Sequence, residues 1–281
     1  MLWPVLGGAA LGYGAIMAAL FALQRRLLYH PDRVHPNLAG LDLAGVREVT
    51  LRTRDGLSLF SWYRPPFGKR PVIVYFHGNG GHIGYRADRL LRLASAGYGV
   101  LLTEYRGYGG NPGRPSERGL YLDAEAALDF LGNERIASTR LVLWGESLGT
   151  GPAVYLASRH RVGAVVLEAP FTSITAAARY HYPWLPVGIM LRDRFDSLSR
   201  IGRIGAPLLV LHGEQDRLVP ARMGRALLAA AAAPKEGWFA PRATHKNLAQ
   251  FGASEVAAGF IERWLAPRRE PAEAVAKLDG S

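Results

Sequence analysis

Cysteine is absent from this chain of 281 residues. Its absence excludes disulfide bonds, thiol catalysis and cysteine-based zinc sites. No two histidines have metal-ligand spacing with a carboxylate nearby, so we expect no metal site. The length suffices for one α/β domain of about 220 residues with appendages, and a core of that size needs no disulfide.

Acidic residues are few, 23 against 34 lysines and arginines, which leaves a net charge of +11. Such an excess of positive charge can attract nucleic acids, anionic membranes or acidic substrates. The arginines are scattered through the chain, and no basic run with interleaved aromatic residues occurs. We therefore expect no nucleic-acid partner, and interpret the charge as compositional bias with a mild attraction to membrane surfaces.

Charge is also missing from the 22 residues between Leu2 and Leu23. A helix of this length spans roughly 33 Å, enough to cross the hydrocarbon core of a bilayer. A cleaved signal peptide would need a basic start and a small-residue exit site, and neither is evident. Because Arg25 and Arg26 follow directly, we expect a transmembrane anchor at residues 1–24 and, by the positive-inside rule, a cytoplasmic remainder. A buried core helix or a cleaved signal are the alternatives.

Short apolar runs alternate with helical patterns along most of the chain. This alternation predicts an α/β fold in which parallel strands are joined by right-handed crossovers. A hairpin around Arg54-Asp55-Gly56 precedes it, at residues 46–53 and 57–63. The expected strands are 72–76, 99–104, 141–144, 164–168, 207–211 and 237–240, and the expected helices are 83–96, 116–131, 148–159, 220–232 and 254–265.

The same pattern divides the chain into segments. We expect a linker at 25–45, the α/β domain at 46–266 and a disordered, charged tail at 267–281. Residues 170–206 form an insertion between two strands and are expected to be a short cap. The centre of this cap, residues 180–190, is aromatic and apolar, which fits either a substrate wall or membrane-facing lip, or plain packing of a small lid.

Gly145-Glu146-Ser147-Leu148-Gly149 has the Gly-x-Ser-x-Gly form of a nucleophile elbow. An apolar strand precedes it and a helical pattern follows. A serine in a strained strand-to-helix turn needs small neighbours on both sides, which the two glycines supply. The turn exposes the hydroxyl at the top of a sheet and directs a helix N-terminus at developing negative charge. Ser147 is therefore the candidate nucleophile.

A serine hydroxyl needs an imidazole to take its proton and a carboxylate to orient that imidazole. After an elbow these partners follow in the order acid, then histidine. Asp216 and His245 each lie just past a predicted strand, where the active sites of parallel sheets gather. Glu214 is the nearest alternative acid, with Asp193 and Asp196 behind it.

The backbone donors of an oxyanion hole are expected at Asn79 and Leu148. A glycine-rich turn, His77-Gly78-Asn79-Gly80-Gly81, follows a dense apolar strand and lets N–H groups face a substrate, while Leu148 follows the nucleophile. An ordinary loop is the plain alternative. A nucleotide-binding loop would need Gly-Lys-Ser, Gly-Lys-Thr or Gly-x-Gly-x-x-Gly, and none is present here. His77, His181 and His212 are interpreted as supporting residues, and Arg106 as one that fixes a loop.

Together these motifs resemble the α/β-hydrolase superfamily, and within it the small-cap, membrane-anchored branch called bud-emergence-type or serine-aminopeptidase-like hydrolases. The resemblance runs from about Arg25 to Leu265. It implies Ser147 as nucleophile, Asp216 as acid and His245 as base. Two positions depart from the family pattern: Glu104 stands where Asp is usual, and Thr244 where Gly precedes the histidine. The motifs that carry the resemblance are 27–31, 76–81, 104–109, 145–149, 169–173 and 212–216.

The sequence thus predicts a serine hydrolase that transfers an acyl group from an ester or thioester to water, with no cofactor. The expected substrate is a small or lipid-like acyl compound. An aminopeptidase would need a carboxylate cluster for the substrate amine, and the cap offers only Asp193 and Asp196. A catalytically silent member of the fold that serves as a binding module, or a membrane-tethered scaffold, are the other possibilities.

Overall fold

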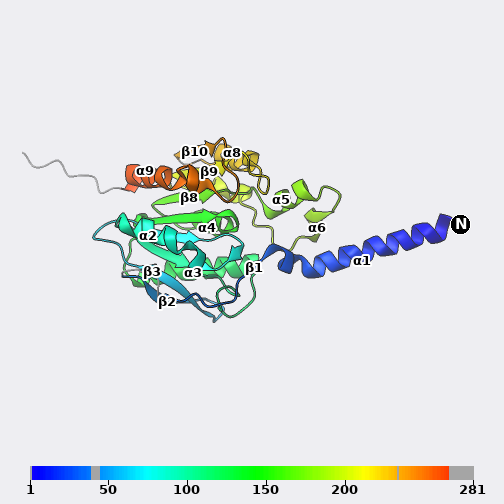
Figure 1. The fold of residues 1–281 in the computed structure, drawn as a ribbon, viewed down its shortest axis with the longest axis horizontal. Coiled ribbons are helices and arrows are strands. Elements are labelled where there is room, and N and C mark those ends of the chain that lie inside the picture. The colour runs from blue at the N-terminus through cyan, green and yellow to red at the C-terminus, as the bar shows by residue number, and fades with distance from the viewer. Residues whose placement is uncertain (1, 39–44, 233, 266–281) are drawn as a thin grey trace, which may run out of the picture.

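An eight-stranded sheet forms the centre of the computed structural model, which describes residues 2–38, 45–232 and 234–265. Figure 1 shows this sheet with helices on both sides and one long helix projecting from the domain. The strand order is β10-β9-β8-β7-β4-β6-β3-β2. The strands are β2 (Arg47–Arg52), β3 (Ser58–Arg64), β4 (Val72–Phe76), β6 (Gly99–Thr103), β7 (Leu141–Glu146), β8 (Ala164–Glu168), β9 (Leu208–Gly213) and β10 (Lys235–Ala240).

Strand direction follows the predicted pattern. The strands from β10 to β6 run parallel, because a helical segment joins each to the next along the chain. The hairpin strands β2 and β3 are antiparallel to each other, and β3 is antiparallel to β6. The mostly parallel sheet confirms the expected α/β-hydrolase fold class. It also brings the carboxyl ends of β4, β7, β9 and β10 to one edge, where the candidate residues lie.

Two apolar cores fill the space between the sheet and its helices. One contains side chains of α3 (Glu117–Asn133), α4 (Thr150–Ala157) and α8 (Ala221–Ala230). The other contains side chains of α2 (Ala87–Ser95) and α9 (Ala253–Leu265). The central strands β4, β6, β7, β8 and β9 are buried along their length, except that Glu146 at the end of β7 is half-buried, as expected for strands covered on both faces.

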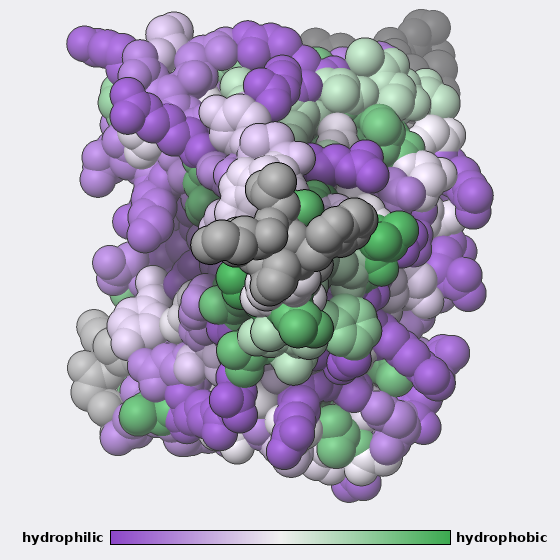
Figure 2. Space-filling view, turned by 90° about the vertical axis from the view of Figure 1, so that its right-hand side faces the viewer, coloured by the Kyte–Doolittle hydropathy of each residue, from purple (hydrophilic) through white to green (hydrophobic). Residues whose placement is uncertain are grey.

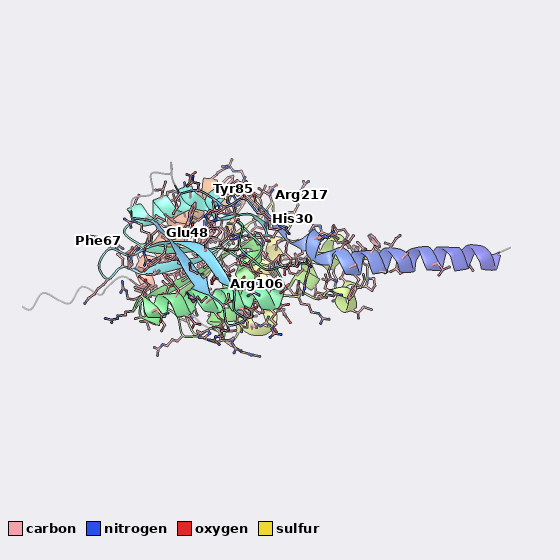
Figure 3. The ribbon with its side chains drawn as sticks, turned by 90° about the horizontal axis from the view of Figure 1, so that it is seen from below. His30, Glu48, Phe67, Tyr85, Arg106 and Arg217 are labelled. Atoms are coloured by element: carbon pink, nitrogen blue, oxygen red, sulfur yellow. The ribbon has the colours of Figure 1, made fainter. Side chains whose placement is uncertain are left out.

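The N-terminal helix α1 (Leu2–Leu28) continues past residue 24, where the sequence placed its end. Its portion Leu6–Leu28 is long and apolar enough to cross a membrane, by length and composition. Figure 3 shows His30 and Arg217 at the end of the domain from which α1 extends, and Phe67 at the opposite end.

Residues 25–45 are more structured than a simple linker where the structure describes them. The last turn of α1 occupies residues 25–28, and β1 (His30–Pro31) pairs in parallel with β5 (Gly80–Gly81). The segment thereby contacts the glycine-rich turn that carries Asn79. Residues 39–44 of the expected linker and the tail at 267–281 lie outside the described residues.

The insertion at 170–206 contains α5 (Ile174–His181), α6 (Val187–Met190) and α7 (Leu198–Ile201). Ser173 caps α5 by accepting a hydrogen bond from the Ala176 N–H. Figure 1 shows α5 and α6 beside the inner end of α1. The contact is specific: the side chain of Gln24 bonds to the backbone of Met190 and of Arg192.

Candidate active site

The elbow adopts the strained turn that its sequence predicts. β7 ends at Glu146, and Ser147 has a φ of +49°, a conformation costly for a residue with a side chain. A Cβ on Gly149 would lie 2.0 Å from the carbonyl oxygen of Phe76, and one on Gly145 would lie 2.5 Å from that of Gly149. The elbow therefore accepts only glycine at both positions.

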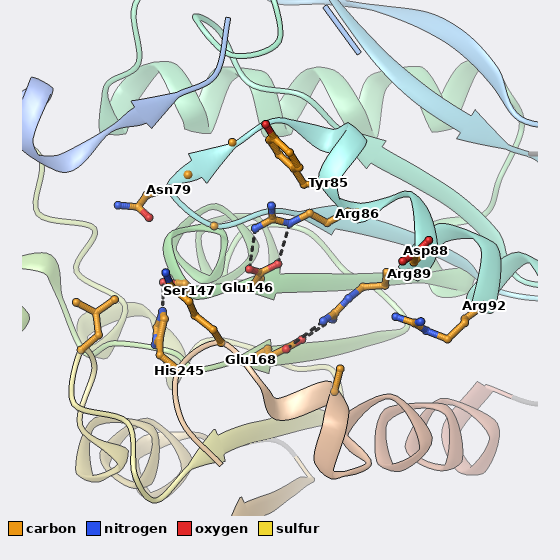
Figure 4. A pocket seen from close by; sticks show the side chains of 16 residues that line it. Asn79, Tyr85, Arg86, Asp88, Arg89, Arg92, Glu146, Ser147, Glu168 and His245 are labelled. Atoms are coloured by element: carbon orange, nitrogen blue, oxygen red, sulfur yellow. Dashed lines mark hydrogen bonds and ion pairs between the residues drawn. The ribbon is translucent and has the colours of Figure 1, made fainter. Parts of the chain in front are cut away.

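Ser147, His245 and Asp216 form a continuous chain of hydrogen bonds. His245 Nε2 is 2.9 Å from Ser147 Oγ, and His245 Nδ1 is 2.6 Å from Asp216 Oδ2. Because Asp216 accepts at Nδ1, that nitrogen carries the proton and Nε2 is left to accept from the serine hydroxyl. Figure 4 shows the contact between Ser147 and His245 at one end of a cavity.

Asp216 is held as a carboxylate by its surroundings. Its Oδ1 accepts hydrogen bonds from the N–H groups of Leu218 and Val219, each at 2.8 Å. Burial raises the pKa of Asp216, but the contacts with His212 and His245 outweigh burial and hold that pKa well below its ordinary range. The carboxylate is therefore ionised at neutral pH and can stabilise a positive charge on His245.

The competing acids make other contacts. Glu214 pairs with Arg225 at the surface. Asp193 accepts hydrogen bonds from Arg25 and Tyr29 and so joins α1 to the cap. Asp196 accepts from the Ser199 N–H within the cap. Of the carboxylates considered from the sequence, Asp216 is the one bonded to His245.

The two expected oxyanion donors lie beside the serine. Asn79 and Leu148 both line a cavity of about 320 Å³ together with Ser147. The Asn79 side chain donates a hydrogen bond to the Leu28 carbonyl, and the backbone carbonyl of Asn79 accepts one from the His30 N–H. Within the described part of the chain, the Asn79 N–H has no hydrogen-bond partner. That free donor is compatible with the predicted role, which stays a prediction.

Buried polar contacts support the glycine-rich turn. His77 contacts Glu104 at 2.9 Å, and both side chains are fully buried. Glu104 also accepts from the Ile83 N–H, so the longer side chain at this position fixes the turn and the start of the next helical segment. The hydroxyl groups of Tyr105 and Tyr108 donate to the carbonyls of the turn.

The other departure from the family pattern is also compensated. Thr244 donates to the Asn247 side chain through both its N–H, at 2.7 Å, and its hydroxyl, at 3.0 Å. This double contact orders the loop that carries His245. Arg106 lies elsewhere, bonded to Asp123 and Asp55, which agrees with its interpretation as a residue that fixes a loop.

A charged network beside the elbow was not foreseen from the sequence. Arg86 makes two hydrogen bonds to Glu146, which also accepts from the Tyr75 hydroxyl. Arg89 pairs in the same way with Glu168. Figure 4 shows both ion pairs lining the cavity beyond Ser147. The partners are 60 and 79 residues apart, so no local spacing signals them.

This network predicts a pH-dependent contribution to stability. Burial raises the pKa of Glu146, but Arg86 and Arg89 outweigh it and lower that pKa from 4.5 to about 2. A depressed pKa stabilises the folded state above the unfolded value, and the stabilisation disappears as pH falls from 4.5 towards 2. Glu146→Gln should therefore cost up to about 3 kcal/mol of unfolding free energy at neutral pH, and less in acid.

Urea unfolding of the detergent-solubilised full-length protein at pH 7 and at about pH 3.5 measures this difference. Glu255→Gln is the control because it removes an exposed carboxylate from α9. If the unfolding free energies of wild type and Glu146→Gln differ by the same amount at both pH values, the charge of Glu146 does not stabilise the fold.

His181 and His212, which the sequence suggests as supporting residues, each contact a backbone carbonyl. His212 contacts the Val219 carbonyl at 2.7 Å and Asp216 at 3.3 Å, and His181 contacts the Leu218 carbonyl. His212 therefore helps to hold Asp216 in place. Among the described residues, no group of three or more acidic or histidine side chains is arranged to hold a metal ion.

Comparisons with known proteins agree with this architecture. The profile of the family described as serine aminopeptidase, S33, matches residues 68–195. The chain is 40% identical over 247 residues to an uncharacterized protein of Mycobacterium tuberculosis, with 87% of this chain and 88% of that protein covered. It is 32% identical to the α/β-hydrolase domain-containing protein WAV2 of Arabidopsis thaliana, with 79% and 81% covered.

Two further comparisons concern proteins named for an activity. Lysophosphatidylserine lipase ABHD12 of Danio rerio is 38% identical, over 62% of this chain and 51% of that protein. The structure of an acetyl xylan esterase from Paenibacillus superposes with a TM-score of 0.69 at 25% identity, covering 89% of this chain and 94% of that one. The chain belongs to the α/β-hydrolase family. It is a hydrolase of the serine-hydrolase type.

Proposed function

We propose that this protein hydrolyses an ester or thioester with Ser147 as nucleophile, His245 as general base and Asp216 as the residue that orients His245. The observation that carries the proposal is the chain of contacts at 2.9 Å and 2.6 Å that joins the three side chains. The 2.9 Å contact is short enough for the Ser147 proton to pass to His245, and the 2.6 Å contact lets Asp216 hold the ring in place without taking a proton.

The reaction proceeds in two acyl transfers. Ser147 Oγ attacks the carbonyl carbon while His245 accepts its proton, and the N–H groups of Asn79 and Leu148 stabilise the oxyanion, each worth about 3 kcal/mol in the transition state. The bond to the leaving oxygen or sulfur then breaks as His245 returns the proton to it. Water, activated by His245, attacks the acyl-enzyme and releases the acid. No step requires a cofactor.

We also propose that α1 anchors the enzyme in a membrane, with the hydrolase domain of residues 46–266 on the cytoplasmic side. The apolar portion Leu6–Leu28 supports the span, and Arg25 and Arg26 in its last turn support the orientation. Residues 25–45 connect the anchor to the domain, and residues 170–206 form its cap.

An aminopeptidase is the second candidate, because the matching family carries that description. Recognition of a substrate amine requires a carboxylate that is free to pair with it. In the cavity beside Ser147, Glu146 and Glu168 are already paired with Arg86 and Arg89, and the other carboxylate that lines it, Asp88, is exposed at the end away from Ser147. This neutralisation favours ester chemistry over release of an N-terminal residue.

Fluorophosphonate labelling of membranes that contain the full-length protein tests the proposal. Wild type should be labelled covalently, and Ser147→Ala should not. Ser95→Ala is the matched control, because it removes an exposed serine hydroxyl from α2 and should leave labelling unchanged. A folded wild type that resists the reagent would show that Ser147 is not activated, and the protein would then be a binding module of the same fold.

A further inference from the structure

Two cavities of different character meet at Ser147. The larger has a volume of about 580 Å³, and the smaller about 320 Å³. Ser147 lines both. His245 lines the larger one only, and Leu148 lines the smaller one only. The nucleophile therefore lies where a substrate could extend in two directions, past the base on one side and past the elbow on the other.

The larger cavity is lined by charged side chains. Besides the ion pairs of Arg86 and Arg89, it includes the exposed cations Arg92 and Lys246 and the exposed carboxylate Asp88. Figure 4 shows Arg92 at the end of this cavity away from Ser147. Such a lining solvates hydroxyl, phosphate or carboxylate groups and gives no favourable contact to a hydrocarbon chain.

The smaller cavity is mostly apolar and continues towards α1. It shares five lining residues with a third cavity of about 500 Å³, which lies between α1 and the cap: Leu27, Leu28, Ile174, Ala178 and Tyr182. The third cavity reaches Leu20 and Phe21 on the apolar portion of α1. We call these two adjacent cavities the apolar corridor. It leads from the candidate membrane span to Ser147.

The chemistry decides which part of a substrate enters each space. His245 must return a proton to the leaving oxygen, so the leaving group has to lie on the side that His245 lines. That side is the charged cavity. The acyl chain, on the other side of the carbonyl carbon, then points into the apolar corridor.

Resting on the proposed function, we propose that the substrate is an ester of a long acyl chain with a polar alcohol, and that its acyl chain enters the apolar corridor sideways from the membrane that holds α1. The occupant of the corridor is thus the acyl chain of a membrane-resident lipid. Its carbonyl reaches Ser147 and its polar head enters the cavity lined by Arg92 and Lys246.

The surface around the mouth of the corridor fits this route. Trp184 and Ile189 of the cap are 64% and 84% exposed, and Tyr182, which lines the corridor, is 51% exposed. Figure 2, viewed along α1, shows hydrophobic residues gathered around the helix axis and hydrophilic ones towards the periphery. An aromatic and apolar rim beside a spanning helix is suited to the interfacial layer of a bilayer.

Chain-length dependence tests the corridor without reference to any leaving group. Methyl and octyl fluorophosphonates carry the same leaving fluoride, which departs as the Ser147 Oγ–P bond forms and the P–F bond breaks. The alkyl group takes the place of the acyl chain. Each buried methylene is worth roughly fourfold in binding, so wild type should react with the octyl probe at least about a hundredfold faster than with the methyl probe.

Ala178→Trp fills the corridor from α5, and Leu27→Trp fills it from α1 at a position that is 59% exposed and so tolerates a larger side chain. In either variant the ratio of octyl to methyl labelling rates should fall at least about tenfold. Ala176→Trp is the matched control, since it lies on the same helix but lines a separate hollow. The thermal midpoint of each variant shows whether it is folded.

Entry of the acyl chain from the membrane is tested with the full-length protein in phosphatidylcholine vesicles. A hexadecyl fluorophosphonate placed in the same vesicles should label wild type faster than the same probe in separate vesicles. Equal rates would overturn entry from the membrane. An octyl preference that persists in both corridor variants would overturn the corridor while leaving the proposed reaction intact. Failure of every probe to label folded wild type would instead overturn the proposed reaction.

Discussion

Replacing Ser147 with alanine, His245 with alanine, or both together should lower kcat by the same factor, on the order of 10⁶-fold. In the proposed mechanism the two side chains act as a unit, because the hydroxyl becomes a nucleophile only when His245 Nε2, 2.9 Å away, takes its proton. Once one is removed, the other has nothing left to contribute. The residual rate comes from the backbone donors and from substrate binding.

Single-turnover and steady-state assays with a short-chain ester measure this effect on the detergent-solubilised protein. The thermal midpoint should change little in Ser147→Ala, because the side chain is half-buried and leaves no large cavity. Independent, multiplicative losses in the double variant would contradict a shared step. They would mean that His245 acts on some group other than Ser147.

The fold could be predicted because its strands are short, apolar and separated by helical patterns. Residues 72–76 and 164–168 are strands at the expected positions, and the hairpin around Arg54-Asp55-Gly56 forms as its turn residues indicate. Buried parallel strands require near-continuous apolar runs, so their positions can be read from hydrophobicity alone. The end of α1 could not be placed as well, since Gln24 and Arg25 are polar residues that its last turn accommodates by contacts with the cap.

Contacts between distant polar residues have no such local signal. The ion pair of Arg25 with Asp193 joins positions 168 residues apart. The pairing of β1 with β5 joins the segment expected to be a linker to the glycine-rich turn. A charged residue that will be buried in an ion pair looks the same in sequence as one that will be solvated. The tertiary fold alone decides which charges meet.

The candidate active site could be predicted less well than the strands but better than the distant polar contacts. The motifs favour an acid just after β9, because the turn there must face the elbow at the carboxyl edge of the sheet, and they leave Asp193 and Asp196 as more distant alternatives. Within that turn, the position after the strand favours Asp216, and Glu214, two residues before it, is the nearest alternative. In the structure Asp216 is hydrogen-bonded to His245, whereas Glu214 is paired with Arg225. The turn from Gly213 to Val219 holds the Asp216 carboxylate in place through the Val219 N–H.

Asp216→Asn should lower kcat roughly 10⁴-fold while Glu214→Gln should leave it unchanged. An asparagine can keep the hydrogen bonds that Oδ1 accepts from Leu218 and Val219, so the turn and the fold should persist. Its amide group would however donate to His245, leaving the ring proton on Nε2 and so preventing it from accepting the serine proton. Loss of the carboxylate also removes the charge that stabilises the imidazolium.

The split between kcat and KM separates this role from a merely structural one. Because the pKa of Asp216 is held well below its ordinary range, Asp216 stays ionised at neutral and mildly acidic pH, so its own protonation should not limit kcat/KM of wild type there. In Asp216→Asn the loss should fall on kcat rather than on KM, and the thermal midpoint should change little. A loss of activity that follows a loss of folded protein would mean that Asp216 only shapes the turn. A larger loss in Glu214→Gln would assign the orienting carboxylate to Glu214 instead.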